Sequence, residues 1–223
     1  MSKKKRAKRA SSKRRPPKRK QKKWILWVVL AAVAVAGVVS HLATRSITPT
    51  NVNAGPLPGL QTGPSPWDPE LSHLRARLKR IGFPTALTME GDDLHIHEHL
   101  DVFDHGQKVE VPENIGISQQ EGFLSPLHTH DATGIIHIES FEQRTFTLGE
   151  FFDVWGVRFS STCIGGYCAD GYNQLSVFVG GQHREGDPRS LGLAAHQQIV
   201  VAFGTDAELP NPIPASYTFP SGL

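Results

Sequence analysis

The longest apolar stretch of the chain, WILWVVLAAVAVAGVVSHLA, covers residues 24–43 and contains no Lys, Arg, Asp or Glu. A helix of about 20 apolar residues is long enough to cross a hydrocarbon core of roughly 30 Å. The tryptophans near its start are typical of a membrane interface. The pattern therefore predicts one transmembrane helix. A cleaved signal peptide is the alternative, although its apolar core usually has only about 7–15 residues.

Beyond this stretch the pattern predicts a linker and two short helices. Residues 44–69 are rich in Pro, Gly, Thr and Asn and have no apolar periodicity, which is typical of a linker. Leucine and isoleucine then recur at helical spacing and predict an amphipathic helix over about residues 70–81, ended by Gly82. A second short helix is expected between the cap residue Thr147 and Gly156.

The rest of the chain has the pattern of β-strands. Residues 93–103 alternate between polar and apolar positions, as a half-buried strand does. Residues 104–106 (Asp-His-Gly) indicate a turn, and residues 108–112 return as the second strand of a hairpin. Further strands are expected over residues 134–140, 175–182 and 199–204. The predicted fold class is α+β, mostly β: one N-terminal transmembrane helix, then a β-rich domain of residues 70–223 with two short helices.

Charge is distributed unevenly along the chain. Residues 1–23 hold 14 of the 24 basic residues and no acidic one, which leaves 10 basic and 21 acidic residues in 24–223. So dense a run of like charge predicts a disordered tail. The positive-inside rule places this tail in the cytoplasm, near anionic lipid headgroups. The domain of residues 70–223 is then expected outside the cytoplasm, tethered to the cell membrane, and its acidic balance argues against nucleic-acid binding.

Three histidines of the first predicted strand share one face. Side chains on a strand alternate between its two faces, so His95, His97 and His99 point the same way, and Asp101 continues their face. The opposite face carries the apolar side chains Leu94, Ile96, Leu100 and Val102. We expect the apolar face to lie in the core and the imidazoles to line a surface or a pocket.

A second group of histidines follows in the segment LHTHDATGIIHIE. His128 and His130 form another His-x-His pair with Asp131 beside them, and His137 and Glu139 share one face of the next predicted strand. Clustered imidazoles with a nearby carboxylate are typical of Zn²⁺ and Cu²⁺ sites. A Cu⁺ site built from thioethers and thiolates is poorly supplied, because the chain has only two methionines and two cysteines.

Strand spacing limits which histidines can share an ion. Residues two apart on a strand lie about 6.7 Å apart, whereas His95 and His99 lie about 13 Å apart and cannot easily share one ion. We therefore expect His97 and His99 to bind one Zn²⁺ or Cu²⁺ together with His128, His130 or His137. Three further candidate ligands complete the set: His95, Asp131 and Glu139.

Three interpretations of these clusters remain open. The first is a membrane-anchored metal-binding domain with no assigned reaction. The second is a metalloenzyme, in which an open coordination position lowers the pKa of bound water and Glu139 or Asp131 acts as the base. The third is an interaction module of the cell envelope, in which the histidines form a hydrogen-bonded network or a pH-sensitive patch. The pattern indicates no substrate, protein partner or oligomeric state.

The two cysteines, Cys163 and Cys168, are separated by four residues that include Gly165 and Gly166. Outside the cytoplasm an even number of cysteines favours a disulfide, and the paired glycines permit a tight turn. The spacing differs from that of Cys-x-x-Cys redox pairs. We therefore expect a structural disulfide, which stabilises a loop of this size by roughly 2–3 kcal/mol.

The motifs LHIHEHLDVF, SPLHTHDATGIIHIE and FTLGEFFDVWG resemble those of a group of uncharacterised bacterial membrane proteins. These proteins have one N-terminal anchor and a His-rich extracytoplasmic domain. The resemblance covers roughly residues 70–223 and implies a bacterial envelope context, with no activity attached. Cupins also place His-x-His on a strand followed by a carboxylate, but the second cupin motif, with its Pro-x-Gly and later histidine, is not matched.

Overall fold

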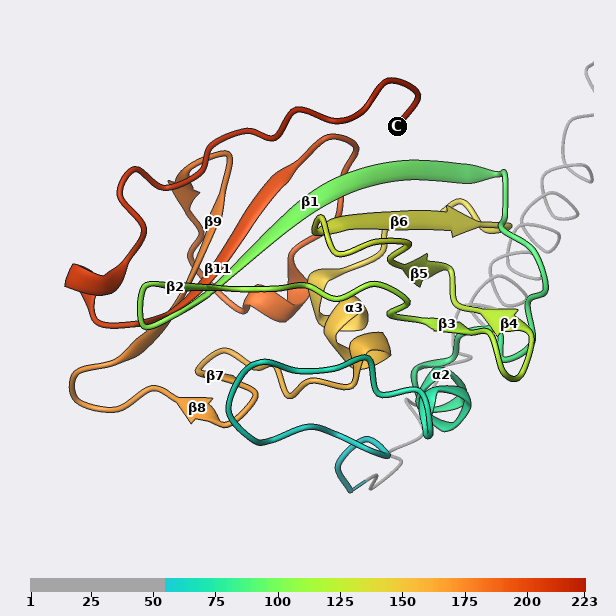
Figure 1. The fold of residues 1–223 in the computed structure, drawn as a ribbon, viewed down its shortest axis with the longest axis horizontal. Coiled ribbons are helices and arrows are strands. Elements are labelled where there is room, and N and C mark those ends of the chain that lie inside the picture. Colours follow the sequence, from blue (N-terminus) through green and yellow to red (C-terminus); the bar gives the residue numbers. More distant parts are fainter. Residues whose placement is uncertain (1–54) are drawn as a thin grey trace, which may run out of the picture. The chain divides into compact units, whose positions relative to one another are not determined.

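A seven-stranded mixed sheet organises residues 55–223, which are the residues that the computed structural model describes (Figure 1). The strand order is β10–β9–β11–β1–β6–β5, and β2 pairs with β1 beside this path. The strands of this sheet are β1 (Leu94–Asp104), β2 (Gln107–Val109), β5 (Leu127–His128), β6 (Ile135–Ser140), β9 (Gln174–Val179), β10 (Gln182–His183) and β11 (Gln198–Gly204).

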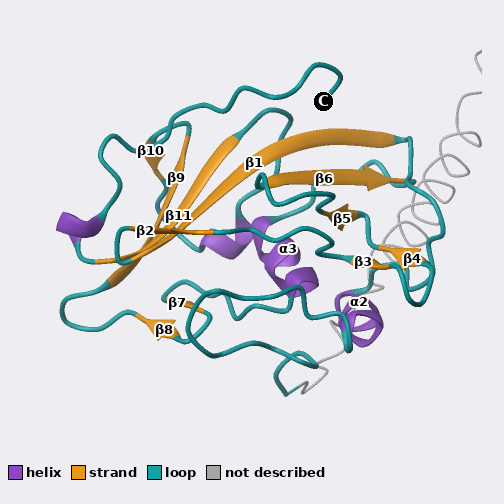
Figure 2. Ribbon diagram, in the orientation of Figure 1, coloured by secondary structure: helices purple, strands orange, loops and turns teal. Residues whose placement is uncertain are grey.

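Smaller elements accompany the sheet. Two two-stranded sheets are formed by β3 (Ile117–Ser118) with β4 (Phe123–Leu124), and by β7 (Cys163–Ile164) with β8 (Tyr167–Cys168). The helices are α2 (Leu74–Ile81) and α3 (Leu148–Trp155), with short 3₁₀ turns η1 (Pro188–Ser190) and η2 (Asp206–Glu208). The prediction of a mostly β domain with two short helices is therefore confirmed (Figure 2).

The long strand β1 joins the two halves of the sheet. Its first half pairs antiparallel with β6, and its second half, from His99, pairs parallel with β11. The end of β1 turns back into β2 as the predicted hairpin. The two turn residues, His105 and Gly106, both have positive φ values, of 48° and 76°, as the commonest two-residue hairpin turn requires.

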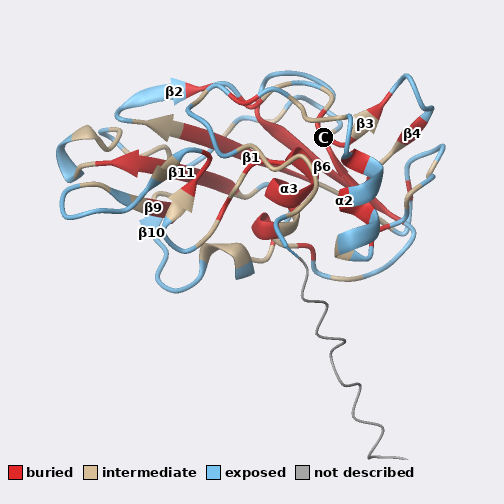
Figure 3. Ribbon diagram, turned by 90° about the horizontal axis from the view of Figure 1, so that it is seen from below, coloured by how far each residue is buried: buried red, intermediate tan, exposed pale blue. Residues whose placement is uncertain are grey.

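One face of the sheet packs on α3 (Figures 1 and 3). The core contains Leu100 and Val102 from β1, and Phe151 and Trp155 from α3, all buried. The helix begins as the sequence predicts, because Thr147 and Glu150 form a reciprocal capping box that satisfies two free backbone N–H groups. The apolar face of β1 is thus the core face, as its alternation predicts.

The C-terminal segment covers part of the opposite face (Figure 1). Leu209 and Ile213 pack against Phe178, Val200 and Ala202 of the sheet. Further along this segment, Tyr217 stacks on the ring of His99, with 3.7 Å between the ring centroids. The face that carries the histidines is therefore partly enclosed rather than fully open to solvent.

Helix α2 is shorter at its start than the periodicity predicts. It begins at Leu74 rather than near residue 70 and ends at Gly82, which takes the left-handed conformation. The carboxylate of Glu70 accepts a hydrogen bond from the backbone N–H of His73 and pairs with the side chain of Arg77. Glu70 therefore lies before the first turn and contacts the start of the helix through its side chain.

Residues 55–69, the second part of the predicted linker, pack against the domain. The side chain of Trp67 is buried, with its ring 6.1 Å from that of Trp155 and 6.3 Å from that of Tyr167 between centroids. Gln61 also forms a parallel bridge with Val157. The predicted cytoplasmic tail, the transmembrane helix and residues 44–54 of the linker lie outside the described residues.

Within residues 55–223, no helix is both long enough and apolar enough to cross a membrane. A disulfide joins Cys163 to Cys168 across the β7–β8 hairpin, as predicted.

The core face of β1 also carries one carboxyl group, that of Glu98. Its side chain is fully buried, and neither oxygen has a hydrogen-bond partner among the described residues. Burial raises the pKa of Glu98 well above its usual range. The folded protein therefore holds Glu98 protonated at pH values where the unfolded chain ionises it.

Replacing Glu98 with glutamine is expected to stabilise the fold by an amount that grows with pH. Above about pH 4.5 the unfolded chain releases the Glu98 proton and the folded state keeps it. The free energy of unfolding of the wild type therefore falls by up to about 1.4 kcal/mol per pH unit until the folded pKa is reached. Glutamine removes this dependence. Urea unfolding of both proteins at pH 4.5 and pH 8, with a chelator present, measures it.

The exposed Glu142 provides the control. Glu142→Gln should change stability little at either pH. A Glu98→Gln effect of equal size at the two pH values would show that Glu98 does not titrate abnormally.

Candidate metal centre

Three histidines form a row across neighbouring strands of the sheet. His97 of β1 lies opposite His137 of β6, and His137 lies opposite His128 of β5. Residues directly opposite one another in antiparallel strands point to the same face. The three imidazoles therefore share the face away from α3. Their rings are close, with centroids 4.6 Å apart for His97 and His137 and 5.5 Å apart for His128 and His137.

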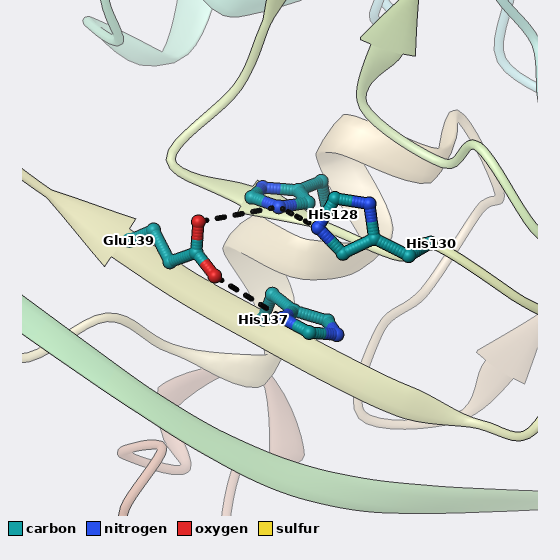
Figure 4. A group of neighbouring side chains, drawn as sticks. All are labelled: His128, His130, His137 and Glu139. Atoms are coloured by element: carbon teal, nitrogen blue, oxygen red, sulfur yellow. Dashed lines mark hydrogen bonds and ion pairs between the residues drawn. The ribbon is translucent and has the colours of Figure 1, made fainter. Parts of the chain in front are cut away.

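The carboxylate of Glu139 lies at the centre of the group. Glu139 follows His137 by two residues on β6 and so shares its face. Its Oε1 lies 3.2 Å from Nδ1 of His137 and 3.2 Å from Nε2 of His95. Its Oε2 lies 3.7 Å from Nε2 of His128 (Figure 4). One buried carboxylate thus contacts histidines from all three strands.

His130 closes the group from the segment that follows β5. Its Nε2 lies 3.1 Å from Nε2 of His128 (Figure 4), and its side chain is 44% exposed. His128, His130, His137 and Glu139 each offer one ligand atom, and these atoms all lie within 4.8 Å of one another. Two nitrogens bound to one tetrahedral Zn²⁺ at about 2.0–2.1 Å lie about 3.3 Å apart, so this group needs little rearrangement to hold an ion.

A backbone contact sets the tautomer of His128. Its Nδ1–H donates to the carbonyl oxygen of Ser125 over 2.9 Å. Because that nitrogen holds the proton, Nε2 carries the lone pair, and it points at His130 and Glu139. Metal-binding histidines commonly have this second contact, which orients the ring.

Burial and charge favour the protonation states that a metal requires. Burial lowers the pKa of His128 to about 4, against a smaller opposing effect from Glu139. For Glu139, burial raises the pKa, but the hydrogen bond from His137 and the charges of His128, His137 and His95 outweigh it, so the net pKa lies below its usual range. At neutral pH His128 is therefore neutral and Glu139 ionised.

A second group shares Glu139. It consists of His95, His97 and Glu139, again with one ligand atom each and all within 4.8 Å of one another. Nε2 of His97 lies 3.9 Å from Oε1 of Glu139. His97 is buried, and burial followed by the nearby His137 and His95 lowers its pKa to about 4.

His99, which was expected to bind beside His97, lies outside both groups. Its Nδ1 is 2.8 Å from the side-chain oxygen of Gln198, and its Nε2 is 2.9 Å from the carbonyl oxygen of Thr133. Both ring nitrogens are therefore engaged by other protein groups. The reason is the pairing of the strand: the antiparallel pairing of β1 with β6 ends at His99, and from His99 onward β1 pairs with β11. The first strand thus contributes His95 and His97 in place of His97 and His99.

Asp131 also lies outside both groups. Its carboxylate accepts hydrogen bonds from the backbone N–H and the hydroxyl of Thr133, within its own turn. One contact of the site, the Ser125 carbonyl, has no sequence signal. Glu139 is among the further candidates that the sequence indicates, and the structure places it in both groups.

Comparison of the chain with protein-family models, with curated proteins and with solved structures finds no match. The geometry of these two groups is therefore the basis for inferring the function.

Proposed function

We propose that the chain binds a divalent transition metal through His128, His130, His137 and Glu139. The observation that carries the proposal is that four possible ligand atoms, from β5, the turn that follows it and the adjacent strand β6, converge within 4.8 Å. Oε2 of Glu139 supports it further, because this atom is buried and has no hydrogen-bond partner among the described residues. A buried unsatisfied oxygen is costly, and a bound cation would satisfy it.

The donor set favours Zn²⁺ or Cu²⁺. Three imidazoles and one carboxylate suit these borderline ions, whereas Mg²⁺ and Ca²⁺ prefer oxygen ligands alone. Thiolates do not contribute, since both cysteines form the disulfide. Four protein ligands fill a tetrahedral shell, which is the arrangement of sites that hold an ion rather than catalyse a reaction. We therefore propose binding as the primary role of this group.

We also propose that the domain acts outside the cytoplasm, tethered to the cell membrane by residues 24–43. The basic residues 1–23 and the apolar stretch that follows support this orientation. The Cys163–Cys168 disulfide is consistent with an oxidising compartment.

His130 offers the cleanest test of the metal proposal. Its side chain is 44% exposed, so replacing it with alanine leaves the core intact. We expect the purified full-length chain to bind Zn²⁺ or Cu²⁺. His130→Ala should bind the ion about 10–100-fold more weakly, because the ligand set is incomplete. Competition with a chromophoric chelator at pH 7.5 measures both affinities.

The matched control is His183→Ala. His183 is also about half exposed and also has a carboxylate partner, Glu185, but it lies on β10, away from the centre. It should leave the affinity unchanged. The proposal fails if the wild type binds neither ion, or if His130→Ala binds as tightly as the wild type.

A further inference from the structure

Two ligands remain unused when one ion is bound by His128, His130, His137 and Glu139. They are His95 and His97, which with Glu139 form the second group. A tetrahedral ion takes four ligands, and the first group already supplies four. The second group is therefore either structural or a second metal position.

Unsatisfied buried atoms lie on both sides of Glu139. Oε2, which faces His128, and Nε2 of His97 are both buried and have no hydrogen-bond partner among the described residues. A purely structural network would be expected to satisfy both atoms, because leaving a buried polar atom unpaired costs about 1–3 kcal/mol. An ion in the first group would satisfy only Oε2, and Nε2 of His97 would remain unpaired.

The carboxylate of Glu139 is oriented as a bridge. Its Oε1 faces the second group, at 3.2 Å from Nε2 of His95 and 3.9 Å from Nε2 of His97. Its Oε2 faces Nε2 of His128 in the first group at 3.7 Å. Each oxygen can therefore serve a different ion, although Oε1 also contacts His137.

We propose that the chain holds two divalent ions, with Glu139 as a bridging ligand and His95 and His97 as the remaining protein ligands of the second ion. This inference rests on the proposed function, since it adds an ion beside the first. The second ion has three protein ligands, so one tetrahedral position is left for water or another small ligand. His95 is 52% exposed and places this position next to solvent. Adjacent ions of this kind occur in hydrolytic two-metal sites.

The exposed ligands His95 and His130 give a matched pair of variants. Zn²⁺ is titrated into the full-length wild type, His95→Ala, His130→Ala and the control His183→Ala, and bound ions are counted by native mass spectrometry. We expect two ions in the wild type and the control. His95→Ala should lose the second binding step and keep the tighter one. His130→Ala should weaken the tighter step.

Electron paramagnetic resonance of the Cu²⁺-loaded chain gives an independent readout. Two Cu²⁺ ions bridged by one carboxylate should couple magnetically, and His95→Ala should show the signal of a single uncoupled ion.

The possible outcomes separate the two proposals. One ion in the wild type that His95→Ala leaves unchanged and His130→Ala weakens would overturn the two-ion inference and leave the proposed function standing. No bound ion would overturn both. A single ion lost in His95→Ala but kept in His130→Ala would also overturn both, because the ion would then lie outside the four-residue group.

Discussion

Glu139→Gln is expected to weaken metal binding by more than about 100-fold, the largest effect of any single substitution in the centre. Glu139 is the only residue that belongs to both groups, and its carboxylate is the only negative charge in either group. Glutamine keeps the shape but removes the charge. Loss of an outer partner of a ligand alone costs about 10–100-fold, so loss of the shared ligand should cost more. Chelator competition at pH 7.5 measures the change.

Glu185→Gln is the matched control for this substitution. Glu185 follows His183 by two residues, as Glu139 follows His137, and the two side chains lie 3.1 Å apart. It is 91% exposed and has no part in the centre. Its replacement should leave the affinity within a factor of about two of the wild type, which corresponds to about 0.4 kcal/mol of binding free energy. Wild-type affinity in Glu139→Gln would remove the carboxylate from the centre and the bridging argument with it.

Arg77→Met is expected to lower the free energy of unfolding by about 3–5 kcal/mol, the usual cost of breaking a buried ion pair. The guanidinium of Arg77 is fully buried. It donates to the carbonyl oxygens of Asp153 and Val154 at 2.9 and 3.0 Å and pairs with Glu70. Those carbonyls belong to the last turn of α3, where helix carbonyls lack partners of their own.

The substitution therefore removes a helix cap and leaves the partly buried Glu70 carboxylate with His73 as its remaining partner. Thermal unfolding should show a midpoint lower by roughly 10 °C, since 1 kcal/mol corresponds to about 2–4 °C in a domain of this size. Arg77→Lys should not restore stability, because an ammonium cannot bridge several acceptors in one plane as the guanidinium does.

Arg75→Met provides the comparison from the same helix. Arg75 is 43% exposed and pairs with the exposed Glu121. Its loss should cost no more than about 1 kcal/mol. Equal effects of the two substitutions would contradict a special role for the buried guanidinium.

Local pattern predicts much of the sheet. The alternation in residues 93–103 indicates β1 and its apolar face because the side-chain period of a strand is 2. The turn at His105 and Gly106 and the cap at Thr147 are predicted correctly, because both depend on interactions among residues a few positions apart. The disulfide is predicted for the same reason, since its two cysteines share one short hairpin.

The local sequence pattern does not predict which charged side chains are buried. Arg77 stands among the basic residues of an amphipathic helix, yet it is fully buried against the end of α3, which lies 76 residues away in sequence. Glu98 occupies the apolar face of β1, and nothing in its neighbours indicates an unpaired carboxyl in the core. Both positions depend on what packs opposite them, which only the tertiary arrangement specifies.

The sequence likewise predicts only part of the candidate centre, and the tertiary structure decides the rest. The sequence by itself indicates which histidines cluster, that those of β1 share a face, and that imidazole and carboxylate ligands suit Zn²⁺ or Cu²⁺. Only the tertiary structure decides that His95 and His97, rather than His97 and His99, meet Glu139. The physical reason is register: β1 pairs with β6 so that His97 lies opposite His137 and His95 opposite Glu139. A shift along β6 would leave every local pattern unchanged and assemble a different set of ligands.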